Sequence, residues 1–258
     1  MAGELKNRVG EKFLTNEGYE IEIIEYYGNR RCTVRFNDER GTIVANKEYA
    51  DLKKRIVKNP FHKSLYGVGY MGQGIYKGRH PRGEHTKMYN TWKNMLERCY
   101  SERCQEKSPT YIGCTVDERW HNFQVFAKWF EDNFNPAYMD RWHLDKDVLK
   151  KSNKIYSPET CVIVPNEINC LVIKTDATRG NLPIGVSKSG KRFMSNLRAG
   201  KEDRKPTYLG TFDTPEEAFQ AYKIAKEEYI KVVADKYKNK ITEQCYQALY
   251  NYQVEITD

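Results

Sequence analysis

The stretch Gly185–Tyr222, GVSKSGKRFMSNLRAGKEDRKPTYLGTFDTPEEAFQAY, decides the fold of the last third of the chain. It predicts three short strands followed by an amphipathic helix. The helix is expected to begin at Thr214, because its hydroxyl suits an N-cap, Pro215 fits the first turn and the next two glutamates face the positive helix end. The apolar positions of the predicted sheet are Val186, Phe193, Met194, Leu197, Tyr208, Leu209 and Phe212.

One face of this predicted sheet is basic. Alanine and tyrosine residues recur at helical spacing after Thr214, so the helix is expected to cover the other face. A basic three-stranded sheet backed by a helix can lie in a nucleic-acid groove, and the alternative is a basic face that is merely solvated. The basic residues expected on the uncovered face are Lys188, Lys191, Arg192 and Arg198. The residues expected to contact DNA are these four with Phe193, Asn196 and Tyr208.

The same stretch resembles the ethylene-response-factor type of DNA-binding domain. Two positions depart from the family pattern: Ser187 stands where plant members usually place a base-contacting arginine, and Phe193 replaces a common tryptophan. The resemblance therefore implies binding of double-stranded DNA without implying a target sequence. The matching motifs are Gly185-Val186, Lys191-Arg192-Phe193, Tyr208-Leu-Gly-Thr-Phe-Asp-Thr214, Glu216-Glu217-Ala218 and Ala221-Tyr222.

Length and charge favour several small domains and an anionic partner. The chain has 258 residues and a net charge of +8, from 43 Lys+Arg against 35 Asp+Glu. No apolar run reaches the length of a membrane span, and the N-terminal residues lack a signal-peptide core. Seven cysteines without regular spacing fit reduced thiols, so we expect a soluble protein of the cytoplasm.

The first part of the chain reads as a small all-β domain over residues 1–57. Between positions 9 and 45, segments rich in β-branched and aromatic residues are separated by the turn sequences Asn16-Glu-Gly18 and Gly28-Asn29. A small SH3-like barrel and a curled sheet are the two expected forms. Its role is open between nucleic-acid docking and scaffolding, with scaffolding favoured.

Residues 58–88 are rich in Gly, Lys and Tyr and are expected to form an extended connector. They contain Gly67-Val-Gly69-Tyr-Met-Gly72, a literal G-x-G-x-x-G. A dinucleotide site needs an apolar strand before this motif and a helix opening at its last glycine, and neither is predicted here. We therefore expect no small-molecule cofactor at this motif.

Residues 89–176 are expected to hold helices and a strand–loop–strand–helix unit. Two helices are predicted over 89–133, and their aromatic stripes read as core. A strand ending in Leu144-Asp145-Lys146-Asp147 is followed by a polar turn around Ser152-Asn153, the strand Cys161–Val164 and a helix from Pro165. Such a ββα unit can hold a divalent metal between its first strand and its helix.

This region resembles the HNH, or His-Me finger, nucleases carried by phages. The resemblance implies a phage-encoded endonuclease acting in a bacterial host cell, with Mg²⁺ or Mn²⁺ as cofactor. The family's catalytic histidine position is filled by Lys146, which leaves Lys146, His143 and Asp147 as the candidate catalytic residues. The implied metal ligands are Asp145, Asn153 and Asn169. The matching motifs are Tyr89, Trp92, Met95, Arg98-Cys99-Tyr100, Cys114-Thr-Val, Trp120, Asn122-Phe123, Leu144-Asp145-Lys146-Asp147, Tyr156-Ser-Pro-Glu159 and Cys161.

Cysteines also surround the predicted unit, but their spacing argues against structural zinc. Cys99, Cys104, Cys114 and Cys161 include no Cys-x-x-Cys pair, so small core residues are the favoured interpretation. Three functions stay open: a metal-dependent DNA endonuclease, a DNA-binding protein of the same fold without cleavage, and a protein-interaction inhibitor. A monomer or a homodimer is compatible with each.

The sequence thus predicts an α+β chain of several domains. These are a small β domain over 1–57, a connector over 58–88, a helical region with a degenerate HNH-like ββα unit over 89–176, and a sheet-plus-helix DNA-binding domain with a C-terminal helix over 177–258.

Overall fold

The computed structural model describes residues 7–28, 30–134, 142–171, 181–198 and 205–256, and it shows a chain of mixed α and β structure with several small sheets. The chain divides into two compact units. The first is Met1–Tyr89 with Glu118–Phe126, and the second is Asn90–Asp117 with Ala127–Asp258. The boundary expected between positions 176 and 177 therefore falls inside the second unit.

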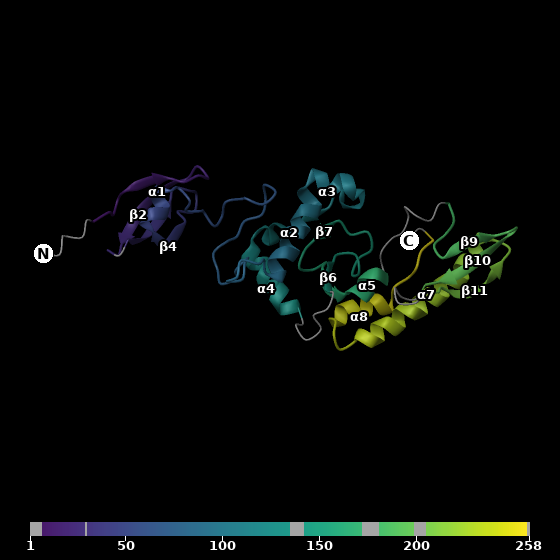
Figure 1. Ribbon diagram of the computed structural model, residues 1–258. Coiled ribbons are helices and arrows are strands. Elements are labelled where there is room, and N and C mark those ends of the chain that lie inside the picture. Colours follow the sequence, from purple (N-terminus) through teal and green to yellow (C-terminus); the bar gives the residue numbers. More distant parts are fainter. Residues whose placement is uncertain (1–6, 29, 135–141, 172–180, 199–204, 257–258) are drawn as a thin grey trace. The chain divides into compact units, whose positions relative to one another are not determined.

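The first unit is built on a four-stranded antiparallel sheet (Figure 1). Its strands pair in chain order, which leaves β1 and β4 as the two edges. Within the described residues the sheet is open, so the barrel expectation is wrong. The elements are β1 (Lys12–Leu14), β2 (Glu20–Tyr26), β3 (Arg31–Phe36), β4 (Ile43–Glu48) and α1 (Tyr49–Lys53).

Alternation along β2 and β3 explains which face of this sheet is buried. Ile21 and Ile23 on β2 alternate with glutamates, and Val34 and Phe36 on β3 lie opposite them in the ladder. These side chains pack with Leu52 of α1 into a small core. The core is closed by partly buried aromatic rings from Phe13, Tyr19, Tyr26 and Tyr49.

The segment expected as a connector is anchored rather than free. Tyr70 forms a parallel bridge with Asn122, and Gly72 lies so close to the Asn122 side chain that a Cβ atom would overlap it. Gln124 holds the next residues through hydrogen bonds to Met71 and Tyr76. In the G-x-G-x-x-G sequence, Gly67 and Gly72 thus serve a turn and close packing, and α2 begins only at Lys87.

Helices occupy the region where they were expected. Trp92, Met95, Leu96 and Cys99 of α2 are buried, which confirms their aromatic and apolar stripe as core. On α4 the buried stripe is Phe123, Phe126, Ala127 and Phe130. The elements are α2 (Lys87–Tyr100), α3 (Glu102–Lys107), η1 (Pro109–Tyr111), β5 (Thr115–Val116), η2 (Glu118–His121) and α4 (Phe123–Asn133).

A strand–loop–strand–helix arrangement follows α4. Strands β6 (Trp142–Asp145) and β8 (Val162–Pro165) pair antiparallel, and α5 (Asn166–Leu171) begins directly after β8. Between them the short β7 (Ile155–Tyr156) pairs in parallel with β5. The side chains of Val162 and Val164 are buried, so the β6–β8–α5 arrangement contributes to the core of the second compact unit.

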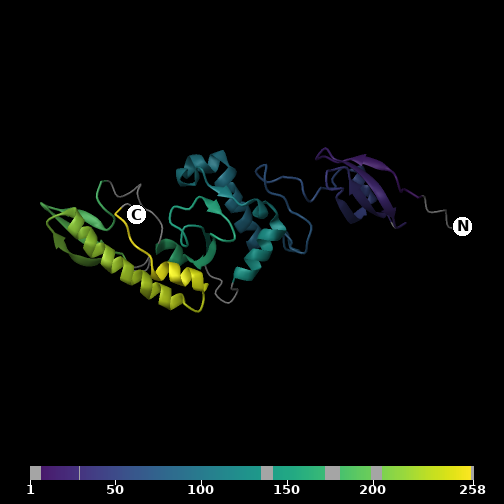
Figure 2. The ribbon, with the colours of Figure 1, turned by 180° about the vertical axis from the view of Figure 1, so that it is seen from behind.

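The C-terminal part forms three antiparallel strands covered on one side by a long helix (Figure 1, Figure 2). Thr214 caps the helix in a capping box with Glu217, as the sequence predicts. Tyr222 packs against Gly185. This position requires a glycine because its φ is 76° and a Cβ atom would overlap the Tyr222 ring. The elements are β9 (Val186–Ser189), β10 (Arg192–Leu197), β11 (Thr207–Phe212), α7 (Pro215–Tyr237) and α8 (Glu243–Tyr250).

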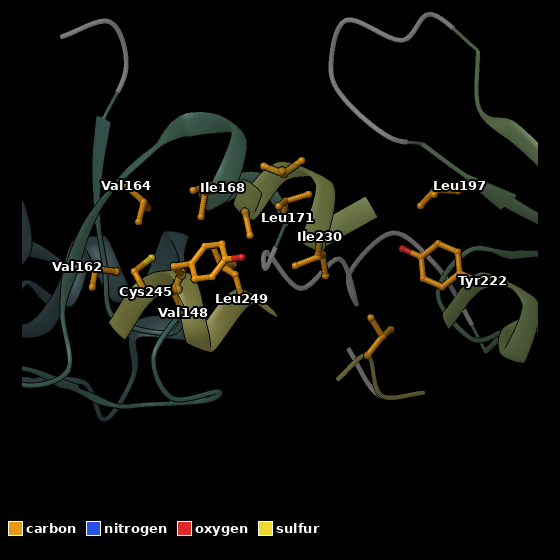
Figure 3. Close-up of a cluster of buried hydrophobic side chains, with 14 of the residues drawn as sticks. Val148, Val162, Val164, Ile168, Leu171, Leu197, Tyr222, Ile230, Cys245 and Leu249 are labelled. Carbon is orange, nitrogen blue, oxygen red and sulfur yellow. The ribbon is translucent and has the colours of Figure 1, made fainter. Parts of the chain in front are cut away.

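One hydrophobic core joins this C-terminal part to the segment of β6, β8 and α5, within the second compact unit (Figure 3). Val164 and Ile168 pack in the same cluster as Ile230 of α7 and Leu249 of α8. At its edge, Glu167 accepts hydrogen bonds from Lys236 Nζ at 2.5 Å and from the Tyr237 hydroxyl at 2.8 Å. Within the described residues, no helix combines the length and the apolar character needed to cross a bilayer.

Candidate nucleic-acid interface and central loop

The side of the C-terminal sheet that faces away from α7 is defined by β10. Ser195 and Leu197 are buried, and Leu197 joins the core with residues of α7. Because side chains alternate along a strand, Arg192, Met194 and Asn196 point the other way. Arg192 is exposed, whereas Met194 and Asn196 are partly exposed.

The register of the neighbouring strands completes this surface. On β9, Ser187 lies opposite Met194 and Ser189 opposite Arg192. On β11, Tyr208 lies opposite Asn196 and Thr211 opposite Met194, with a bulge at the intervening Leu209. The residues that we call the open face are Ser187, Ser189, Arg192, Met194, Asn196, Tyr208 and Thr211, continued by Arg198 after the end of β10.

The register also corrects the expected placement of two residues. Lys188 pairs with Phe193 and lies two positions from Val186, which packs on the core beside α7. Lys188 and Phe193 therefore belong to the α7 side of the sheet, and the expectation that Lys188 shares a face with Arg192 is wrong. Lys188 is exposed at the far end of β9. Lys191 lies in the turn between β9 and β10, at the end of the sheet.

The electrostatic character of the sheet is uniformly positive over its described strands and turns. Every charged side chain in residues 186–198 and 205–212 is a cation: Lys188, Lys191, Arg192, Arg198 and Lys205. One acidic residue follows β11, where Asp213 Oδ1 lies 2.8 Å from Arg192 Nε. Both members of this pair are exposed, so it contributes little to stability and leaves the Arg192 guanidinium accessible.

Tyr208 is the most exposed aromatic ring on the open face. Its side chain is 59% exposed, and its hydroxyl lies 2.8 Å from the Thr211 hydroxyl. This contact holds the ring on the sheet, where its face and hydroxyl stay available to a ligand. The sequence indicates Tyr208, Arg192, Asn196 and Arg198 as DNA contacts, whereas Met194 is expected only as an apolar position of the sheet. The strand alternation counted from Leu197 would have placed Met194 on the open face.

The central loop between β6 and β7 is held by its own polar side chains. Asp145 Oδ1 accepts hydrogen bonds from the backbone N–H groups of Asp147 at 2.7 Å and Val148 at 2.8 Å. Burial raises the pKa of the Asp145 carboxyl, and the two N–H donors offset only part of that effect. Asp145 thus acts as a local turn-forming acceptor.

Lys146 is buried and fully engaged. Its Nζ donates to both carboxylate oxygens of Asp147, at 2.9 and 2.7 Å, and to the Asn153 carbonyl oxygen at 2.7 Å. The Tyr156 ring lies beneath it, with the centroid 5.9 Å from Nζ. The geometry makes Lys146 the internal counter-ion of the loop, although the sequence indicates it as a candidate catalytic residue.

Asn153 closes the loop from the other side. Its Nδ2 donates to the carbonyl oxygens of Lys146 at 2.9 Å and Ile155 at 2.7 Å, and its Oδ1 accepts from the Ile155 N–H at 3.1 Å. Both ends of the carboxamide are therefore occupied. The remaining two candidates stand apart from this network: His143 is exposed on β6, and Asn169 is half-buried on α5.

These residues do not fit a Mg²⁺ or Mn²⁺ site in this arrangement. Such ions need several oxygen ligands free to converge on one point. Asp147 is paired with Lys146, the Asn153 amide oxygen accepts a backbone N–H, and a cation near Asp145 would be repelled by the buried Lys146 ammonium. Across the described residues, no group of three or more His, Cys, Asp or Glu side chains is placed to hold a metal ion.

The cysteines near the loop are buried thiols. Burial raises the pKa of Cys99, of Cys161 and of Cys245 to about 12 in each case. A zinc ligand must be a thiolate, so the protein environment favours the protonated, core-forming state. All seven cysteines are free, and Cys104 and Cys170 are the two that are only partly buried.

Comparison with known proteins leaves the chain without an assigned family. No protein-family model matches it, and no match is found among curated proteins or solved structures.

Proposed function

We propose that the protein binds double-stranded DNA through the open face of the β9–β11 sheet. The observation that carries this proposal is the placement of Arg192 and Arg198 on the same side of β10, away from α7, with Tyr208 beside them. Cations at the two ends of a strand suit phosphates that flank a groove, and the side chains between them can face base edges. The net charge of +8 supports the same class of partner.

The side chains between the two arginines allow a limited base readout. Asn196 carries an amide that can pair with adenine, and Met194 offers an apolar contact to a thymine methyl group. Ser187 is short and lies opposite Met194, and it stands where plant members of the resembling family usually place a base-contacting arginine. In this proposal phosphate contacts dominate the affinity, so binding is strongly salt-dependent.

A salt titration of binding tests the proposal. Fluorescence anisotropy of a labelled duplex would be recorded for the wild type and for an Arg192→Ala/Arg198→Ala variant. The plot of log K against log salt has a negative slope, and loss of two phosphate contacts should make it less steep by about 1.8. Lys128→Ala, on the exposed side of α4, is the matched control in the same unit, and equal binding by all three proteins would remove the open face as the DNA site.

Metal-dependent cleavage of DNA is a second candidate, favoured by one observation. The order β6, loop, β8, α5 is the strand–strand–helix order in which a divalent metal can be held. The side chains of the loop argue against it, because Lys146 is bound to Asp147 and the Asn153 carbonyl, and Asp145 accepts two backbone N–H groups. Incubation of supercoiled plasmid with Mg²⁺ or Mn²⁺, comparing wild type with Asp145→Ala, separates the candidates: cleavage that Asp145→Ala abolishes would establish the nuclease.

A further inference from the structure

Residues 73–86, which we call the basic finger, form an ordered projection just before α2. The backbone turns back on itself: the His80 N–H donates to the Glu84 carbonyl at 2.7 Å, and the Gly83 N–H donates to the His80 carbonyl at 2.9 Å. Arg79 and His85 form an antiparallel bridge, and the Thr86 N–H donates to the Gly78 carbonyl at 3.0 Å. The segment therefore has one defined conformation.

The base of the finger is fixed to the start of α4. The Gln124 carboxamide binds three backbone groups: its Oε1 accepts from the Tyr76 N–H at 3.0 Å, and its Nε2 donates to the carbonyls of Met71 at 3.1 Å and Tyr76 at 3.0 Å. Gly74 lies against the Gln124 side chain so closely that any Cβ atom would overlap it. A second clamp is His85, which stacks on Tyr89 with ring centroids 4.6 Å apart.

The side chains that leave this anchored backbone are mostly cations. Lys77, Arg79 and Arg82 are exposed, against the single carboxylate of Glu84. Arg79 donates to the Gly83 carbonyl at 2.7 Å and so stiffens the tip. Lys77 and Arg82 extend into solvent, and neither side chain has a hydrogen-bond or ion-pair partner within the described part of the chain.

An exposed apolar residue, Ile75, precedes these cations in the same segment, two positions before Lys77. Ile75 is 81% exposed, more than any other large hydrophobic side chain among the described residues. A rigid backbone that presents one isoleucine to solvent next to lysine and arginine is the combination used by segments that enter the minor groove of DNA. A single exposed apolar side chain is common on protein surfaces, so Ile75 supports a partner surface only in combination with the cations of the same segment.

We propose that the basic finger is a second DNA contact, in which Lys77 and Arg82 bind phosphates and Ile75 packs into the minor groove. This inference rests on the proposed function for the identity of the polymer, but it uses residues of the other structural unit. Two contacts on one chain raise the effective affinity without any new interaction between them. The expected role of residues 58–88 as a passive connector is then replaced by an active one.

The test compares four full-length proteins on one labelled duplex across a salt series. They are the wild type, a finger variant (Lys77→Ala/Arg82→Ala), an open-face variant (Arg192→Ala/Arg198→Ala) and a control variant (Arg35→Ala/Lys54→Ala) that removes the same charge from exposed sites of the finger's own unit. The finger variant should bind roughly tenfold or more weakly and lower the salt slope by about 1.8. The control should bind like the wild type.

Each outcome decides a different statement. If the finger variant and the control bind alike while the open-face variant is weakened, the finger is overturned and the open face stands. If only the finger variant is weakened, the finger stands and the open face fails. A wild type that ignores duplex DNA at low salt overturns both. Ile75→Ala adds a charge-free check: it should weaken binding several-fold and leave the salt slope unchanged, and wild-type affinity would remove the minor-groove contact.

Discussion

Lys146 and Asp147 form an ion pair in which the buried ammonium contacts both carboxylate oxygens, at 2.9 and 2.7 Å. Lys146 is 8% exposed, whereas the Asp147 side chain is 39% exposed. The pair closes the loop between β6 and β7, in which Lys146 Nζ also donates to the Asn153 carbonyl oxygen. The role of Lys146 in this loop is therefore structural.

Removing the carboxylate of this pair should destabilise the fold strongly. Asp147→Asn leaves the Lys146 ammonium buried with only neutral acceptors, and breaking such a pair costs about 3 kcal/mol. Urea denaturation followed by circular dichroism gives the free energy of unfolding. Lys128→Ala is the matched control, because it breaks the exposed ion pair with Asp132 and should cost less than about 1 kcal/mol. Similar losses in the two variants would contradict the buried role of Lys146.

Asp145 gives a prediction about pH. Its pKa is raised, chiefly by burial, so the folded state holds the proton more tightly than the unfolded chain does. Stability due to this group is therefore highest below the unfolded pKa of about 3.9 and declines as pH rises through the folded pKa. Asp145→Asn keeps an acceptor for the N–H groups of Asp147 and Val148 and removes the ionisation.

We expect Asp145→Asn to match or exceed the wild-type melting temperature at pH 7, with the difference vanishing at acid pH. Thermal unfolding across pH, with Mg²⁺ and with EDTA, measures this. A metal ligand at Asp145 would give the opposite pattern: Mg²⁺ would raise the melting temperature of the wild type, and Asp145→Asn would lose that gain.

The contribution of Glu167 to stability should depend on pH in the opposite direction to that of Asp145. Burial alone would raise its pKa, but the hydrogen bonds from Lys236 and Tyr237 outweigh it and hold the pKa below the ordinary value. The stabilisation is present above the unfolded pKa of about 4.3 and is lost as pH falls through the folded pKa. Glu167→Gln should cost about 1 kcal/mol at pH 7 and flatten the acid limb of the stability curve. An unchanged acid limb would show that the lock between α5 and α7 carries no free energy.

Two glycines of the C-terminal sheet separate packing from backbone strain. Gly185 has φ 76° and lies against the Tyr222 ring, whereas Gly190 has φ 63° and nothing within 4 Å of a Cβ position. Gly190→Ala should cost only the strain of the left-handed conformation, about 1 kcal/mol. Gly185→Ala should cost clearly more, because the sheet must also move away from α7. Equal destabilisation in chemical denaturation would mean that the Gly185–Tyr222 contact is not close.

Much of the fold follows from local patterns. The cap at Thr214 and the alternation of β2 depend on residues near in sequence, so both could be predicted. The capping box and the buried Ile21 and Ile23 confirm them. The anchoring of residues 70–76 on Asn122 and Gln124 could not be predicted. It joins segments about fifty residues apart, partly through hydrogen bonds from the Gln124 side chain to backbone groups, and these leave no periodic signal.

The candidate sites show the same division. Arg192 and Arg198 follow from strand parity alone once β10 is located, whereas Lys188 was misplaced because the register of β9 was unknown. Lys146 and Asn153 bond to each other, and Asp145 bonds to the N–H groups of Asp147 and Val148. These contacts depend on loop geometry, which residue identity does not reveal. Their identities suggested ligands, and their hydrogen bonds show an internal network.

The central claim is that DNA binds the open face of the sheet, and amide chemical-shift mapping of the full-length protein with an unlabelled duplex at low salt tests it most directly. We predict the largest shifts at Arg192, Met194, Asn196 and Tyr208, with little change at Ile224 and Val232 on the exposed side of α7. Shifts that avoid β10, or a spectrum that the duplex leaves unchanged, would contradict the claim.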